Sequence, residues 1–528
     1  MRGDRRGTDA DVSADVVVVG AGPAGLTVAS ELAAAGAEVL VLEAGGLPYD
    51  REDRSNLPRA IRDHIRGPQS GARGSGSGEP YFPLRMSRAR GIGGSTNTLK
   101  SHGLRGRPLD PIDFEPRFDV TWPITYAELE PFIGDAEVYC GMRSAEDPPI
   151  DWSPSSLAIG NGSSVILDAA PFLHGQRGQF ANLGTALRTG GAIRVVTGAT
   201  VTGFETDGTG SVTHVEVRSP GRSAFRAGGR HFVIATGGID NARLLLSSRP
   251  VQYLMGPAGA HVGRSFMEHL HYVPAVLFPG SEAAADDIRR ICGDADRTDN
   301  WIVLSDTTTR AESLLRVAYH ATPIHELSAE PAVPAFGDLV RMFPFGPFGI
   351  RGRARQAAQA MGGLHHVARA MKARVGGTAD QAAFALVVMS EQIPDPYSRI
   401  TLTGRTDRVG LPLPHLHWRV GRRDFADAQR STELLAAEVE GLGIGKVVSL
   451  WDRGRERPPV VSGGWHHMGT TRMSADPASG VVDANGRVHG IDNLYVAGSS
   501  VFATSGYANP TITLVALAVR LGRHLARI

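Results

Sequence analysis

The stretch ADVVVVGAGPAG at residues 14–25 decides the fold of the first part of the chain. Residues 14–19 include four consecutive valines, which is typical of a strand buried on both faces of a parallel sheet. The turn GAGPAG follows directly, then an apolar helix over residues 26–35 and a second strand over residues 38–43. These elements predict a βαβ unit that opens an α/β domain.

The pattern Gly20-x-Gly22-x-x-Gly25 has the spacing of a dinucleotide fingerprint between a strand and a helix. Gly20 permits the tight turn, Gly22 lets the backbone approach a pyrophosphate, and Gly25 lets helix and strand pack closely. Glu43 ends the next strand, where it is expected to accept hydrogen bonds from ribose hydroxyls and to repel the 2′-phosphate of NADP. A glycine-rich turn without a ligand is the alternative interpretation.

NAD and FAD bind to the same fold, so other segments must decide between them. Residues 90–97 (RGIGGSTN) form a second loop that can direct backbone N–H groups at a pyrophosphate or a flavin edge. Residues 235–238 (ATGG) and 493–500 (NLYVAGSS) bring small residues to the ends of predicted strands. No second GxGxxG follows a strand, because GLGIGK at 441–446 follows a predicted helix and is interpreted as a turn. One dinucleotide is therefore indicated.

Size and composition are those of a globular protein with two joined domains, since 528 residues exceed one simple core. The net charge of +1 gives no field that would favour nucleic acid or an anionic membrane. There are two cysteines, Cys140 and Cys292, and no apolar run approaches the roughly 20 residues of a membrane helix. The N-terminal segment carries arginines but lacks the apolar stretch of an export signal, so a cytoplasmic location is expected.

Elements that could complete the first βαβ unit lie in the middle and at the end of the chain. Residues 66–79 are rich in glycine and serine and are predicted to be a mobile loop. This distribution predicts a discontinuous nucleotide-binding domain with a second domain inserted in pieces. The other predicted elements are strands at residues 193–196, 201–205, 212–217, 231–236, 384–389, 398–403 and 493–496, and helices at residues 241–248 and 510–527.

Four segments together resemble the glucose–methanol–choline (GMC) oxidoreductases. They are GAGPAG at residues 20–25, RGIGGSTN at 90–97, VGRSFMEH at 262–269, and HHMGTTRM with RVHGIDNLYVAGSSVFATSGYANPTIT at 466–473 and 487–513. The last block is most similar to the branch of pyranose oxidases and bacterial glycoside oxidases. The resemblance covers the chain except for about residues 280–385.

The resemblance implies a Rossmann-like FAD-binding domain joined to a substrate domain on a mostly antiparallel sheet. Residues 1–110, 180–272 and 460–528 are expected to form the first domain, and residues 111–179 and 273–459 the second. The residues expected to bind FAD are Gly20, Gly22, Pro23, Ala24, Gly25, Glu43, Ala44, Arg90, Gly91, Gly93, Gly94, Ser95, Asn97, Thr98, Val201, Ala235, Thr236, Gly237, Asn241, Gly498, Ser499, Asn509, Pro510 and Thr511.

The family's active-site base is the first residue of an H-x-x-G-T motif, which is His466 in this chain. The second catalytic residue is a His or Asn before Pro-Thr, which is Asn509 here. Some relatives bind FAD covalently through a histidine of the glycine-rich loop. This loop has Asn97 in that region and no histidine before His102, so FAD is expected to be non-covalent.

These residues suit the oxidation of an alcohol, in which flavin N5 takes a hydride and the protein takes a proton. A neutral histidine is a suitable base near pH 7, and the amide of Asn509 can orient the same hydroxyl without titrating. Asn509-Pro510 also has the sequence of a helix N-cap followed by a first helical proline. A helix that starts there would direct its positive end at the flavin and favour the anionic reduced form.

Several other residues in the sequence have more than one interpretation. The pairs His466-His467 and His365-His366 lack a cluster of further ligands, so no metal is implied, and no G-x-S-x-G motif supports a serine nucleophile. Residues 343–352 (FPFGPFGIRG) are interpreted as a lid, with a membrane or partner patch as the alternative. Glu391 and Gln392 could face the substrate or solvent.

The sequence thus predicts an FAD-dependent enzyme that oxidises an alcohol of a sugar, glycoside or amino sugar. The electron acceptor is O2 or an external acceptor, and a homo-oligomer is compatible with the chain. Two alternatives remain open: a lyase of the same fold without net redox chemistry, and a flavin-binding protein without turnover.

Overall fold

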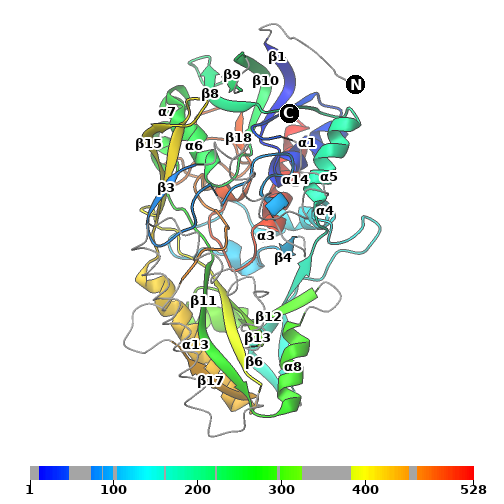
Figure 1. Cartoon of the computed structure of the whole chain (residues 1–528), viewed down its shortest axis with the longest axis vertical. Coiled ribbons are helices and arrows are strands. Elements are labelled where there is room, and N and C mark those ends of the chain that lie inside the picture. Colours follow the sequence, from blue (N-terminus) through cyan, green and yellow to red (C-terminus); the bar gives the residue numbers. More distant parts are fainter. Residues whose placement is uncertain are drawn as a thin grey trace.

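Two large sheets at opposite ends of the molecule organise the chain (Figure 1). The computed structural model describes residues 11–46, 73–85, 87–98, 104–159, 162–219, 223–293, 298–323, 382–450 and 461–528. Figure 1 places the N-terminal strand and the C-terminal helix together at the upper end. No helix in these ranges is long and apolar enough to cross a membrane.

The first sheet has a parallel centre, because four neighbouring strands run in the same direction as β1 (Val12–Val19). Its order is β7-β2-β1-β10-β9-β8, with β18 paired to the second half of β10. Strands β8 and β9 extend one edge as an antiparallel hairpin. The remaining strands are β2 (Val39–Glu43), β7 (Arg194–Thr197), β8 (Thr200–Thr206), β9 (Val212–Arg218), β10 (Phe225–Ile234) and β18 (Leu494–Val496).

Helices cover this sheet where the sequence supplies apolar faces. Helix α1 (Pro23–Ala34) starts one turn after β1 and packs against α14 (Thr511–Leu525), which comes from the other end of the chain. A Cβ at Gly25 would collide with the carbonyl oxygen of Gly20, so the crossing of α1 over β1 requires glycine there. Helix α5 (Gln179–Thr189) also contacts α1.

The second sheet is antiparallel, in the order β17-β11-β14-β13-β12-β6-β4, with β5 also paired to β6. Helices α8 (Glu282–Cys292) and α13 (Arg422–Gly441) pack on it. The hydroxyl of Tyr319 forms hydrogen bonds with Ser431 and Thr432 on α13. Its strands are β4 (Arg105–Gly106), β5 (Ser155–Ile159), β6 (Gly162–His174), β11 (Leu270–Pro279), β12 (Thr298–Leu304), β13 (Val317–Pro323), β14 (Phe384–Ser390) and β17 (Gly445–Ser449).

A third, small sheet corrects one prediction. Its order is β15 (Arg399–Thr406), β16 (Pro412–Trp418) and β3 (Ser75–Gly78), so residues 75–78 form a strand rather than part of a mobile loop. The Gly/Ser sequence of β3 gives no strand signal, because its backbone alone pairs with β16. Ser75 and Ser77 add hydroxyl contacts to His415.

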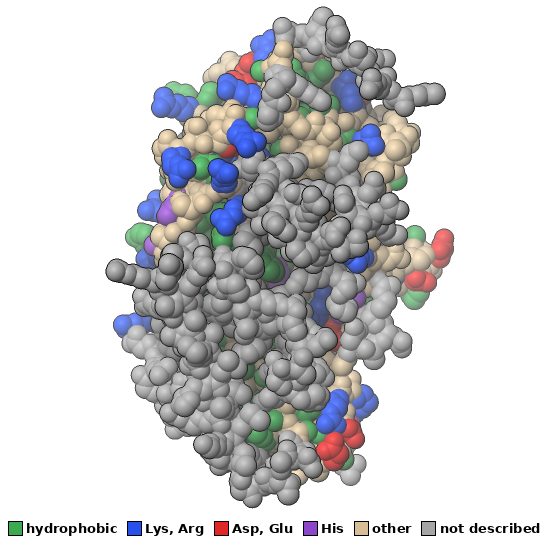
Figure 2. Space-filling model, viewed as in Figure 1, with side chains coloured by type: hydrophobic (Ala, Val, Ile, Leu, Met, Phe, Trp, Pro, Cys, Tyr) green, Lys and Arg blue, Asp and Glu red, His purple; other side chains and the backbone are tan. Residues whose placement is uncertain are grey.

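Short helices connect the sheets and occupy the loops. They are α3 (Tyr126–Leu129), α4 (Ile133–Tyr139), α6 (Asp240–Ser247), α7 (Arg249–Leu254), α9 (Asp306–Glu312), and the 3-10 helices η3 (Gly94–Thr98), η4 (Pro111–Phe114), η5 (Glu130–Phe132), η6 (Gly256–His261) and η8 (Ser499–Val501). On the face shown in Figure 2, acidic and basic side chains mix over α8, where Arg289 pairs with Glu282 and Asp286.

The predicted fold class, a discontinuous Rossmann-like domain with an antiparallel second sheet, is confirmed. Strand β10 ends at Ile234, two residues earlier than predicted. Residues 281–300 contain α8 and the start of β12. The exact domain boundaries stay a prediction. The segment 343–352, His102 and His365-His366 lie outside the described residues.

Candidate active site

The predicted nucleotide residues gather at one edge of the first sheet. Strands β1, β2, β10 and β18 run parallel, so their carboxyl ends meet there. Backbone hydrogen bonds continue past the strands, from Gly20 N–H to Leu42 O at 2.8 Å and from Ala497 N–H to Ile234 O at 2.8 Å. In open α/β sheets ligands bind outside the carboxyl ends of the strands.

The glycines at this edge form a cradle that fits a dinucleotide. Gly20 has φ +106°, and a Cβ there would lie 2.5 Å from Ala235 O. A Cβ at Gly22 or Gly237 would meet nothing closer than 4.0 Å, so the backbone at both positions is open to approach. Helix α1 has neither a side-chain cap at Gly22 nor an acidic residue in its first turn. Its free N–H groups and positive end suit a pyrophosphate.

The second glycine-rich loop lies directly on the first turn. Gly93 N–H donates to Ala21 O at 2.8 Å, and a Cβ at Gly94 would lie 2.8 Å from Gly22 Cα. The amide of Asn97 holds the loop from within by donating to Ile92 O at 2.8 Å. The two predicted loops are therefore neighbours, and Arg90, Gly91, Ser95 and Thr98 lie on the same segment.

Glu43 joins these loops through its buried carboxylate. Oε2 accepts the N–H of Ala21 at 2.8 Å, and Oε1 accepts the N–H groups of Gly45 at 2.6 Å and Gly91 at 2.9 Å. Each carboxylate oxygen has two acceptor sites, so one site on Oε2 is left for a ribose hydroxyl. The ribose contact stays a prediction, while the bracing of both loops is a function that the sequence did not reveal.

Asn241 and Ser499 form hydrogen bonds that connect the segments following β10 and β18 with each other and with a neighbouring loop. Asn241 Oδ1 accepts the N–H of Thr236 at 2.7 Å, and Nδ2 donates to Ala497 O at 3.1 Å. Ser499 Oγ donates to the carbonyl of His467 at 2.7 Å, which links this edge to the predicted catalytic loop. The other predicted cofactor residues at this edge are Pro23, Ala24, Ala44, Val201, Ala235, Gly237 and Gly498.

His466 and Asn509 come together, although 43 positions separate them. The amide nitrogen of Asn509 donates to His466 Nε2 at 3.2 Å. The pairing of Met267 with Met468 and of His271 with Ser462 positions the loop that carries His466. Burial first, and then neighbouring histidines, hold the pKa of His466 well below 6.5. The imidazole is therefore neutral at physiological pH, the state that a base requires.

The predicted N-cap role of Asn509 is wrong. Helix α14 begins at Thr511, Pro510 occupies the N-cap position, and no side chain caps the helix. Asn509 is one residue too far from the helix to reach its first N–H groups, so its amide is available to His466. The first turn of α14 contains no acidic residue, which leaves its positive end uncompensated beside this pair.

His269, which the sequence analysis named only within the motif 262–269, determines the tautomer of His466. His269 Nε2 lies 3.2 Å from Ser505 O, and a carbonyl can only accept, so Nε2 carries the proton. Burial lowers the pKa of His269 to about 4, so the ring is neutral and its Nδ1 is an acceptor. His466 Nδ1, 2.8 Å away, must then donate to it. This leaves the lone pair of His466 on Nε2, beside Asn509.

A buried carboxylate behind the two histidines is a second feature that the sequence did not reveal. Glu268 accepts the N–H groups of Gly464 and His466, and burial raises its pKa to about 7. Tyr81 donates to Glu268 and lies 2.9 Å from His467 Nε2. His467 is thereby held by Tyr81, away from Asn509, so the two adjacent histidines have different partners. The Glu-His dipeptide in VGRSFMEH was the available signal.

Glu391 and Gln392 do not face solvent, because both are buried and already paired. Glu391 binds the guanidinium of Arg117 at 3.0 Å, and Gln392 accepts the N–H of Glu268 at 3.0 Å. In the described ranges no group of three His, Cys, Asp or Glu side chains is arranged to hold a metal ion.

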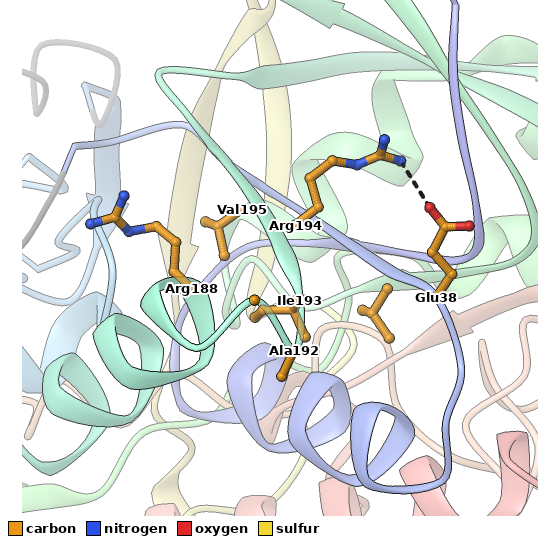
Figure 3. A pocket seen from close by; sticks show the side chains of 8 residues that line it. Glu38, Arg188, Ala192, Ile193, Arg194 and Val195 are labelled. Atoms are coloured by element: carbon orange, nitrogen blue, oxygen red, sulfur yellow. Dashed lines mark ion pairs between the residues drawn. The ribbon is translucent and has the colours of Figure 1, made fainter. Parts of the chain in front are cut away.

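A surface hollow, shown in Figure 3, belongs to neither part of this site. It lies at the amino ends of β2 and β7, beside the ion pair of Arg194 and Glu38 at 3.8 Å. The glycine edge is at the opposite, carboxyl ends of the same strands. The hollow is therefore separated from Glu43 by the length of β2.

Comparisons with known proteins concern the class of enzyme. A family model described as GMC oxidoreductase matches residues 394–518, and one described as FAD dependent oxidoreductase matches residues 15–69. The chain is 26% identical to a 2-methyl-1,2-propanediol dehydrogenase from Mycolicibacterium austroafricanum, over 98% of this chain and 96% of the relative. It is 25% identical to paromamine 6'-oxidase from Streptomyces fradiae, over 97% and 91%.

A local match is stronger, at 38% identity with a C-glycoside 3-oxidase from Microbacterium trichothecenolyticum over 23% of this chain and 22% of the relative. In fold, the chain is similar to the crystal structure of pyridoxine 4-oxidase from Mesorbium loti, with a TM-score of 0.54 and 17% identity over 97% and 98% of the two chains.

The match at residues 15–69 assigns an FAD-dependent oxidoreductase, and the glycine cradle and the parallel sheet fit such a dinucleotide. Together with the C-terminal match, they assign the family: this chain belongs to the glucose–methanol–choline oxidoreductases, in the branch that contains glycoside oxidases.

Proposed function

We propose that the protein oxidises a secondary or primary alcohol of a sugar-like substrate to a carbonyl, with His466 as the base. The observation that carries this proposal is the neutral His466, whose lone pair is directed to Nε2 beside Asn509. FAD, when bound, accepts the hydride that leaves the alcohol carbon. The residues of the glycine cradle and Glu43 would hold its pyrophosphate and ribose.

The two side chains have separate roles in this reaction. His466 Nε2 accepts the hydroxyl proton, and positioned bases of this kind contribute about 10²–10⁴-fold. Asn509 holds the same hydroxyl through its amide and does not titrate. The uncapped start of α14 beside them favours negative charge that develops at the cofactor.

Two relatives support the substrate class through their names and through the share of this chain that they match. Paromamine 6'-oxidase and C-glycoside 3-oxidase are named for reactions on sugar-containing molecules, and the former matches nearly the whole chain. A flavin-binding protein without turnover would not need a base with a fixed tautomer, whereas a lyase would use one as well. We therefore favour oxidation of a sugar, glycoside or amino-sugar hydroxyl, in a cytoplasmic enzyme that passes electrons to O2 or an external acceptor.

An anaerobic substrate screen tests this function. The yellow holoenzyme is mixed without oxygen with sugars, glycosides, amino sugars and simple diols, and the flavin absorbance is followed. The expected result is bleaching by at least one alcohol, with one carbonyl formed for each flavin reduced. A lyase would convert its substrate without net bleaching, and a binding protein would do neither.

The attachment of FAD has its own test. We infer non-covalent binding, because the described part of the glycine-rich loop, residues 90–98, contains no histidine. Acid precipitation should release FAD into the supernatant. Flavin that stays with the pellet after denaturation would show a covalent bond and contradict the inference.

A further inference from the structure

The second sheet turns one face toward the catalytic loops, and its strand register determines which side chains lie there. Trp301 and Met389 form a buried cluster with Tyr507, two residues before Asn509. Side chains alternate between the two faces of a strand, so Asp299 on β12 lies on the same face as Trp301. Ile302 lies on the opposite face and packs in the main hydrophobic core.

Asp299 is the centre of a polar cluster on this face. It is 3% exposed, and Trp301 donates to it from Nε1 at 3.2 Å. Arg105 forms an ion pair with it and donates from Nε to Oδ1 at 3.1 Å. His320 Nε2 and His174 Nε2 lie 3.5 and 3.7 Å from the carboxylate. We call Arg105, His174, Asp299, Trp301 and His320 the Asp299 cluster.

Tyr507 connects this cluster to the catalytic pair, because it packs in the same buried cluster as Trp301 and lies two residues before Asn509. Gly106 follows Arg105 in β4, and a Cβ at Gly106 would be 3.0 Å from Asn509 Cβ. On the other side, the ring of His271 is 6.2 Å from that of His466. Burial first, and then His269 and Arg105, lower the pKa of His271 to about 3, so this imidazole is neutral at pH 7.

Two side chains of the cluster are partly exposed to solvent, unlike those of an ion pair buried in a protein core. The side chain of Arg105 is 31% exposed and that of His320 is 21% exposed, above a carboxylate that is buried. Arg105 also stacks on Trp301, with its guanidinium 5.0 Å from the ring centroid. Arg105 and His320 therefore present polar groups at the solvent side of the cluster, and such groups can donate hydrogen bonds to hydroxyls or accept them.

The charges of the cluster select against charged substrates. Arg105 and Asp299 compensate each other, and burial followed by Arg105 lowers the pKa of His320 to about 3, so this imidazole is neutral at pH 7. The groups that face Asp299 from the neighbouring strands are His174 on β6, Arg105 on β4 and His320 on β13. Among the described residues the cluster has no carboxylate without a cationic partner to receive an ammonium group.

We propose that the Asp299 cluster binds the hydroxyls of an uncharged sugar ring while His466 and Asn509 hold the hydroxyl that reacts. The inference rests on the proposed function and narrows its substrate class from sugars and amino sugars to neutral sugars and glycosides. Asp299 and His320 act in specificity, at a distance from the reacting carbon.

The first test compares substrates with and without additional hydroxyls. Anaerobic flavin reduction is measured with a panel of D-glucose, D-galactose and their methyl glycosides, and with propane-1,2-diol, for the wild type, Asp299→Asn, and Asp286→Asn as an exposed control on α8. In Asp299→Asn we expect kcat/KM for the best sugar to fall about 10–100-fold through KM, and that for the diol to change less than about threefold. Equal losses on both substrates would show that the ion pair is only structural and overturn the proposal.

The second test measures binding without turnover. Holoenzyme His466→Ala is titrated with each neutral sugar, with D-glucosamine and with D-galactosamine, by calorimetry and by the change in the flavin spectrum. We expect a neutral sugar to bind at least about tenfold more tightly than its amino analogue at pH 7, and His320→Leu to weaken that binding. Equal or tighter binding of the amino analogue would overturn the proposal.

The two tests also separate this inference from the proposed function. FAD content and thermal unfolding are recorded for every variant, and His320→Leu decides the result if Asp299→Asn fails to fold. Sugar binding that depends on His320, without flavin reduction by any alcohol, would contradict the oxidase function only. Flavin reduction by sugars that is insensitive to both variants would contradict the Asp299 cluster only.

Discussion

The glycine edge of the first sheet and the Asp299 cluster of the second sheet are built in opposite ways. At the edge, Gly20, Glu43 and Gly237 each lie at or just after the end of a parallel strand, and the backbone supplies most of the polar groups. In the cluster, side chains from β4, β6, β12 and β13 supply every contact. The catalytic loop with His466 is joined to the glycine edge by Ser499 and to β11 of the second sheet by the pairing of Ser462 with His271.

The difference shows why one surface can be recognised from sequence and the other cannot. A backbone site requires glycine at fixed spacing, because a Cβ would block the turn or the ligand, and this requirement leaves a local motif. A side-chain site on an antiparallel sheet requires only the correct register. Residues such as Arg105 and Asp299, 194 positions apart, then meet without a shared motif.

The largest effect is expected where the two surfaces meet. His466→Ala should keep FAD and the fold but slow flavin reduction by about 10²–10⁴-fold, the range of a lost general base. His467→Ala is the matched control, because His467 contacts Tyr81 and not Asn509. Anaerobic stopped-flow mixing with a reactive alcohol measures the chemical step alone. If His467→Ala were the slower variant, the assignment of the base would be wrong.

An intermediate effect is expected at the glycine edge, on FAD affinity rather than on chemistry. Glu43→Ala removes the acceptor of three backbone N–H groups and of the predicted ribose contact, so FAD should bind about 10–100-fold more weakly. Glu38→Ala, on the same segment and 67% exposed, is the control. The rate of flavin reduction at saturating FAD should stay near that of the wild type. A large loss of that rate with unchanged affinity would place Glu43 elsewhere in the reaction.

Much of the fold could be predicted from sequence, because its elements carry strong local signals. The run of valines in β1, the helix after GAGPAG and the turn at 441–446 were all located correctly. Strand β3 was missed, since its Gly/Ser sequence has no β-branched or aromatic residues and its pairing with β16 rests mainly on backbone groups. The helix start near Asn509 was misplaced by the general preference of Asn for N-caps, which the contact with His466 overrides.

The predicted pair His466–Asn509 is adjacent in space, but the residues that position it could not be derived. Glu268 and Tyr81 are ordinary in sequence, and only the pairing of residues 267 and 468 brings them behind His466. The role of Ser505 is carried by its main-chain carbonyl, which no sequence pattern reports. Tautomers depend on such individual hydrogen bonds rather than on residue type.

The smallest predicted effect concerns His269, which connects the carbonyl of Ser505 to the base. His269→Leu removes the acceptor for His466 Nδ1–H, so His466 could carry its proton on either nitrogen and flavin reduction should slow about tenfold. His269→Asn places an amide oxygen near the position of Nδ1 and should stay within about threefold of the wild type.

A pH profile distinguishes this role of His269 from simple packing. His269 is the second cause, after burial, of the lowered pKa of His466. His269 lowers that pKa through its positive charge, which it gains only below about pH 4. Removing it should therefore raise the pKa of His466 in that acidic range, where the loss of rate should begin at a higher pH in His269→Leu than in the wild type. The pH at which the rate falls moves with the pKa of His466, because a base accepts a proton only above its own pKa. A slower variant with an unchanged pH profile would show that His269 supports the loop and not the proton position on His466.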